Sequence, residues 1–150
     1  MKNRFWILLP MLTASSMGFA DAYGLKSLQC SSVLGSTYRL EVTDSQLVFA
    51  ESRVDVKSGA STLVRKEHHV FPIASCRFEP FSINLDCQDP DDKNVSLSVV
   101  LTRAAGKAPS HGIEFRVQGI EEAKSTTFRT ARIDLGKGSR CVVNDTFEVL

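Results

Sequence analysis

The chain has 150 residues, with 18 lysine and arginine residues against 17 aspartate and glutamate residues, 43% hydrophobic residues and four cysteines. A formal charge of +1 excludes the strong electrostatic attraction that draws basic domains to nucleic acids or anionic membranes. The apolar content argues against intrinsic disorder, and the length favours one domain over two.

The first 22 residues have the order of a secretory signal peptide. Lys2 and Arg4 precede an apolar run over residues 5–12, and small residues follow it. This run is far shorter than the ~20 apolar residues of a transmembrane helix. Cleavage after Ala20 and cleavage after Ala22 both fit, and the literal A-x-A pattern of residues 20–22 favours the second.

We therefore expect residues 1–22 to be a Sec-type signal peptide and residues 23–150 to form a single β-domain. Its location would be the periplasm or the exterior of the cell, without membrane insertion after cleavage. Removal of Lys2, Arg4 and Asp21 leaves 16 basic and 16 acidic residues, so the mature chain would be formally neutral.

All four cysteines follow the predicted signal peptide. An even count in an exported chain indicates two disulfides, and no C-x-x-C or C-x-x-H spacing supports a zinc site. Three pairings are possible. We favour Cys76 with Cys87, because residues 79–82 (EPFS) can turn the chain between them. Cys30 with Cys141 would then join the two ends of the domain.

Apolar and polar residues alternate with a period of two through most of the mature chain. The clearest case is residues 95–102, where Val95, Leu97, Val99 and Leu101 alternate with mostly Ser and Thr. Residues 62–71 are extended but poorly patterned, which is typical of an edge strand. Further alternating segments lie at 37–43, 47–56, 83–87, 113–117, 131–135 and 141–149.

Turn signals rich in Gly, Pro and Asp separate these segments, mostly 10–16 residues apart. About eight strands are expected, and no long segment has helical periodicity. The sequence predicts an all-β, antiparallel barrel-like fold, with a β-sandwich as the alternative, because closing or stacking a sheet removes exposed edges.

Residues that could carry chemistry are few. His68 and His69 are neighbours in a predicted strand and should point to opposite faces, so with His111 they are interpreted as surface histidines rather than metal ligands. The acidic segment 89–94 (DPDDKN) lacks the glycine and the final glutamate of an EF-hand loop, and is interpreted as a turn. Residues 124–140 are mildly basic and are interpreted as a solvated face.

No nucleophile or metalloprotease motif is present, so we expect no catalytic, cofactor-binding or metal-binding residues. The sequence favours an exported, soluble, non-catalytic binding module, either inhibitor-like or an accessory protein of the cell envelope. Its partner would be another protein or an envelope component rather than nucleic acid, contacted through loops such as 57–62, 104–112 or 119–126. The alternatives are a small secreted hydrolase whose site assembles on folding, and a β-barrel that binds lipid or a small ligand.

Overall fold

A computed structural model describes residues 24–57, 60–104, 110–120, 128–136, 138–145 and 147–149. Within these ranges nearly all regular structure is β-strand, as expected from the alternation. A single short 3-10 helix, η1 (Ile73–Ser75), lies between two strands. The strands are β1 (Ser27–Ser31), β2 (Thr37–Val42), β3 (Gln46–Lys57), β4 (Ala60–Pro72), β5 (Cys76–Phe78), β6 (Leu85–Gln88), β7 (Ser96–Ala104), β8 (Ser110–Gln118), β9 (Phe128–Asp134), β10 (Arg140–Val143) and β11 (Phe147–Val149).

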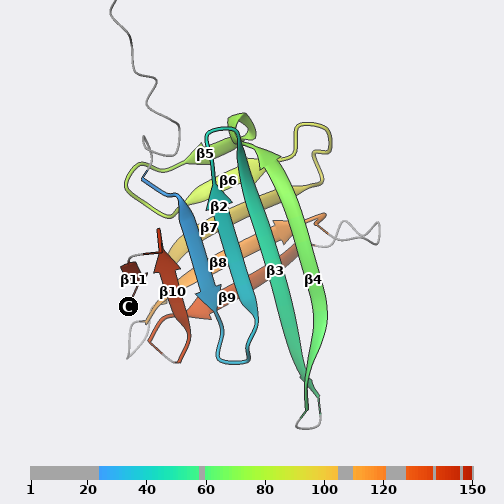
Figure 1. Cartoon of the computed structure of the whole chain (residues 1–150), viewed down its shortest axis with the longest axis vertical. Helices are drawn as coiled ribbons and strands as arrows, with labels where there is room; N and C mark the ends of the chain where they lie inside the picture. The colour runs from blue at the N-terminus through green and yellow to red at the C-terminus, as the bar shows by residue number, and fades with distance from the viewer. Residues whose placement is uncertain are drawn as a thin grey trace, which may run out of the picture.

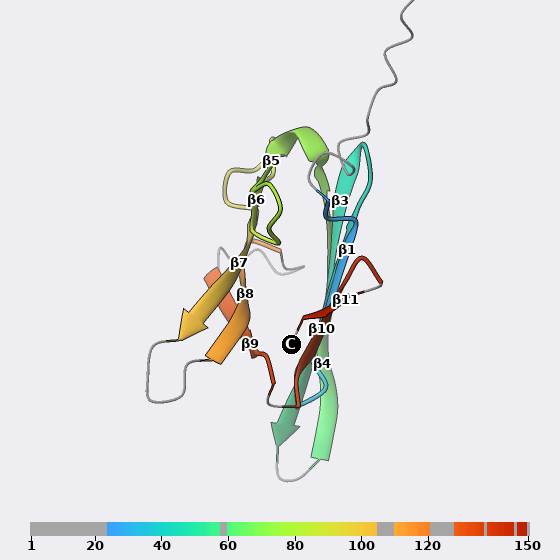
Figure 2. The ribbon, with the colours of Figure 1, turned by 90° about the vertical axis from the view of Figure 1, so that its left-hand side faces the viewer.

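The strands form two antiparallel sheets. One has six strands in the order β11-β10-β1-β2-β3-β4, and the other has five in the order β5-β6-β7-β8-β9. Figure 1 shows the five-stranded sheet behind the other, with its strands crossing at an angle, and Figure 2 shows the two layers side by side. The chain passes from one layer to the other through η1 and again between β9 and β10.

The all-β prediction is confirmed in its sandwich form, and the barrel closure that we expected first is wrong. In the described part of the chain no strand of one sheet pairs with a strand of the other, so β4, β11, β5 and β9 remain edges. Pro72 ends β4, and η1 then turns the chain out of the first sheet instead of extending its ladder. Residues 62–71, predicted to be an edge strand, do lie in the edge strand β4.

The apolar face of each sheet packs against that of the other. In β7, Leu97 and Val99 are buried while Ser96 and Ser98 remain half-exposed, as the alternation predicts. Phe49 and Phe71 of the first sheet and Phe115 of the second belong to the same buried cluster. The two layers thus share one hydrophobic core.

Two disulfides fasten the strands: Cys30 to Cys141, and Cys76 to Cys87, the pairing that the sequence favoured. Each joins residues directly opposite one another on adjacent strands, β1 with β10 and β5 with β6. Disulfides of this kind indicate an oxidising environment outside the cytosol.

The proposed signal peptide, residues 1–22, lies outside the described residues, and the assignment of residues 23–150 to a single domain stays a prediction. The described residues contain no helix with the length and apolarity that crossing a bilayer would require.

Candidate functional site

The β5–β6 hairpin is closed by covalent and hydrogen bonds. The Cys76–Cys87 disulfide joins its two strands, and Phe78 pairs with Leu85 at the end nearest the turn. In the turn, the backbone N–H of Glu79 donates to the carbonyl of Asn84 (3.0 Å), and that of Ser82 donates to the carbonyl of Glu79 (3.3 Å). These contacts restrict the conformations available to the tip.

Asn84 adds three side-chain contacts to the same turn. Its backbone N–H donates to Oγ of Ser82 (3.1 Å), and its Nδ2 donates to Oε2 of Glu79. Its Oδ1 accepts a hydrogen bond from the backbone N–H of Leu101 in β7 (2.7 Å). The turn is therefore fixed both internally and to the neighbouring strand.

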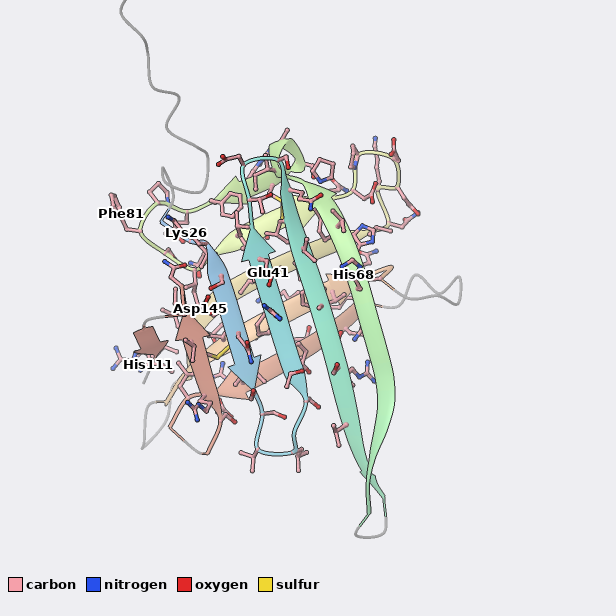
Figure 3. The ribbon with its side chains drawn as sticks, viewed as in Figure 1. Lys26, Glu41, His68, Phe81, His111 and Asp145 are labelled. Carbon is pink, nitrogen blue, oxygen red and sulfur yellow. A yellow bond between two sulfur atoms is a disulfide. The ribbon has the colours of Figure 1, made fainter. Side chains whose placement is uncertain are left out.

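Phe81 is the most exposed large apolar side chain among the described residues. Its relative exposure is 101%, and its φ is +59°, in the left-handed region that non-glycine residues seldom occupy. Figure 3 shows the ring projecting away from the molecule at the hairpin tip. An uncommon backbone conformation that holds an aromatic ring in water is a reason to suspect function.

An apolar groove of about 440 Å³ adjoins Phe81. Both layers contribute to it, and its apolar walls are Leu25, Ile83, Leu101 and Val143. Asn144 fixes the side of the groove formed by the start of β1: its Oδ1 accepts the backbone N–H groups of Lys26 (2.6 Å) and Ser27 (3.1 Å). The hairpin and the groove together make an apolar contact surface.

A second feature is an ion pair between the layers. Glu51 of β3 is only 2% exposed, and its Oε2 accepts a hydrogen bond from Nη1 of Arg129 in β9 (2.7 Å). Tyr38 stacks on Phe115 with ring centroids 4.8 Å apart. Burial raises the pKa of the Tyr38 hydroxyl, and the negative charge of Glu51 raises it further. The Glu51–Arg129 ion pair therefore links the two sheets, and neither residue lines a described pocket.

The histidines lie apart. His68 and His111 are exposed, and Figure 3 places them at opposite sides of the molecule. His69 is half-buried, with Nε2 lying 3.0 Å from Oδ2 of Asp89. The described residues include no group of three or more His, Cys, Asp or Glu that could hold a metal ion. This arrangement does not bring the histidines into a common pocket, as a hydrolase assembled around them would require.

The acidic segment 89–94 is a turn, as its sequence indicated. Oδ1 of Asp89 accepts the backbone N–H groups of Asp91 (2.9 Å) and Asp92 (3.3 Å), while Asp92 accepts that of Asn94 (2.9 Å). The hydrogen bonds that the Asp89 carboxylate accepts, first from the backbone N–H of Asp91 and then from His69, hold the pKa of Asp89 below its usual value. Its carboxylate is thus occupied by protein donors.

Two arginines of the basic stretch 124–140 form ion pairs within the protein. Arg129 is paired with Glu51, and Nε of Arg132 donates to Asp134 (2.7 Å). Within the loops predicted to bind a partner, residues 58–59, 105–109 and 121–126 lie outside the described residues.

Searches against protein-family models, curated proteins and solved structures found no match to this chain. Sequence reasoning identified 79–82 as a turn but missed Phe81. The available signal was a large aromatic residue directly after proline, between two cysteines that could pair. Glu51 was missed as well, although its place two residues after Phe49 continues the inward-facing alternation of β3.

Proposed function

We propose that this protein is an exported, non-catalytic binding module that recognises another protein with the tip of its β5–β6 hairpin. The observation that carries this proposal is Phe81, a fully exposed aromatic ring on a turn fixed by a disulfide and by hydrogen bonds. Phe81 would enter an apolar pocket of the partner, and the adjoining groove would receive an apolar side chain in return.

The energetics of interfaces support this use of the hairpin. Aromatic residues are enriched in interface cores, and a few such anchors carry most of the binding energy. An anchor that is already ordered loses little conformational entropy on binding, which improves affinity. An inhibitor or an accessory protein of the cell envelope would both use a surface of this kind.

Export is part of the same proposal. The two disulfides fit an oxidising compartment, and the basic, apolar and small residues of positions 1–22 fit a Sec-type signal peptide. We infer that the mature protein begins near Tyr23 and meets its partner in the periplasm or outside the cell.

Fluorescence polarisation can test the role of Phe81. The mature protein, labelled at its N-terminus, is mixed with envelope extract of its source cells, and unlabelled competitors then displace it. Phe81→Ala should compete at least about 30-fold less well than the wild type, the effect of losing about 2 kcal/mol at an interface anchor. Phe128→Ala is the matched control, because it removes another exposed phenylalanine, on β9 at the other edge of the same sheet.

Phe81 is fully exposed, so truncating it opens no cavity, and the variant should keep both disulfides and the thermal stability of the wild type. Competition by Phe81→Ala that equals that of the wild type would contradict the proposal. Polarisation that does not rise in any envelope or secreted fraction would contradict it too.

A further inference from the structure

A trough of about 770 Å³, with both polar and apolar lining residues, lies on the outer face of the five-stranded sheet. Its floor consists of β5, β6 and β7, and its ends are η1 and the turn after β6. Figures 1 and 2 both place η1 and that turn at the same end of the molecule. The trough is thus a structured surface, separate from the groove beside Phe81, with which it shares no lining residue.

Two cationic side chains belong to the trough, Arg77 from β5 and Lys93 from the turn after β6. Both residues are exposed, and neither forms an ion pair with a described residue. Asp86 lies opposite Arg77 in the ladder without pairing to it, and the carboxylate of Asp89 is already occupied by His69 and backbone N–H groups. The trough therefore holds two cations without ion-pair partners among the described residues, beside two carboxylates, of which Asp89 already accepts hydrogen bonds from the protein.

The remaining polar groups of the trough are mostly neutral. Ser96 and Ser98 of β7 place hydroxyl groups on the floor, and Gln88 of β6 adds an amide whose Nε2 donates to the carbonyl of Lys93 (3.1 Å). Hydroxyls and amides can both donate and accept hydrogen bonds, which matches a ligand rich in hydroxyl groups. An arginine side chain matches a carboxylate or sulfate with two parallel hydrogen bonds.

We propose that this trough binds an acidic saccharide, with Arg77 and Lys93 receiving its carboxylate or sulfate and the β7 serines its hydroxyls. None of the residues that line the trough is aromatic, so recognition of neutral sugars by ring stacking is not favoured. The same absence disfavours single-stranded nucleic acid, which also relies on stacking. This site is independent of the hairpin tip and goes beyond the proposed protein contact.

Calorimetric titration of the mature, oxidised protein tests the proposal with four probes. Oligogalacturonate supplies carboxylates, dextran sulfate supplies sulfates, neutral dextran supplies hydroxyls alone, and single-stranded DNA supplies phosphates and bases. At least one acidic saccharide should bind, and its affinity should fall as salt is raised. The double variant Arg77→Gln/Lys93→Gln should weaken this binding at least tenfold.

The matched control is Arg39→Gln/Arg140→Gln, which removes the same charge from two exposed positions on β2 and β10, in the other sheet. It should bind within twofold of the wild type. Equal losses in both double variants, binding of dextran or DNA as tight as that of the acidic saccharides, or no binding of either acidic saccharide would each overturn the proposal. None of these results would alter the test of Phe81, which depends on a different surface.

Discussion

At the scale of single residues, the Glu51–Arg129 ion pair stabilises the fold by linking the two layers. Replacing Arg129 by methionine leaves the Glu51 carboxylate buried without its principal cation, which should lower the free energy of unfolding by about 3–5 kcal/mol. Urea unfolding followed by circular dichroism measures this change. The double variant Glu51→Leu/Arg129→Met should recover most of the loss, because an apolar pair needs no desolvation of charge.

A small effect of Arg129→Met, below about 1 kcal/mol, would contradict the assignment of this pair to the dry interior of the sandwich. A double variant less stable than the single variant would show that the charge is not the cause of the loss.

Asp89 gives the molecule a pH dependence that can be measured. Because folding lowers the pKa of Asp89, its contribution is present above the ordinary aspartate pKa of about 3.9 and disappears as pH falls through the lower folded value. Asp89→Asn should therefore be less stable than the wild type at pH 7, by about 1 kcal/mol, and the difference should shrink when the pH is lowered to about 2. Urea midpoints at the two pH values provide the measurement.

The control for this prediction is Asp86→Asn, a neighbouring exposed carboxylate with no described ion pair, which should change stability little at either pH. If the Asp89→Asn difference stayed constant from pH 7 to pH 2, the charge-assisted hydrogen bonds would not be its origin.

At the scale of elements, the two disulfides should differ in their contribution. Cys30 and Cys141 are separated by 111 positions, and Cys76 and Cys87 by 11. Chain entropy then assigns about 5 kcal/mol to the first bond and about 3 kcal/mol to the second. Cys30→Ala/Cys141→Ala should therefore unfold at lower denaturant concentration than Cys76→Ala/Cys87→Ala.

The short disulfide has a second expected effect, on binding. Removing it frees the strands that carry the Phe81 turn, so Cys76→Ala/Cys87→Ala should compete less well for the partner, whereas a folded Cys30→Ala/Cys141→Ala should compete normally. The competition assay described for Phe81→Ala measures both. Equal competition by the two variants would show that binding of the partner does not depend on the hairpin disulfide.

At the scale of the whole molecule, the sequence predicted the strands better than their arrangement. The alternation around Leu97 and Val99 indicates a strand whatever the arrangement of its sheet. It requires only that one face of the strand be buried and the other be in contact with water. Barrel and sandwich share this pattern. The choice between them depends on long-range pairing at the sheet edges, and there the Pro72–Ser75 segment directs the chain into a second layer. The strands β1 and β5 were not predicted, because each contains only two apolar residues in alternation, Leu28 and Cys30 in β1 and Cys76 and Phe78 in β5.

The candidate site was less predictable for a related reason. The residues at 79–82 predict a turn. The exposure of the Phe81 ring, however, depends on which distant parts of the chain pack against this turn, and no local sequence pattern indicates this packing. Glu51 could have been found, since it occupies an inward-facing position in an alternating strand. Its partner Arg129 lies 78 residues further along the chain, beyond any local signal.

Phe81 is the proposed anchor of a protein interface, and photo-crosslinking from position 81 tests this role most directly. The mature protein with p-benzoylphenylalanine at position 81 is irradiated in envelope extract, beside a control with the same residue at position 128. Position 81 should give a discrete protein adduct that excess wild-type protein suppresses and excess Phe81→Ala does not, while position 128 should not give that adduct. The same adduct from both positions, or suppression by Phe81→Ala as complete as by the wild type, would contradict the account.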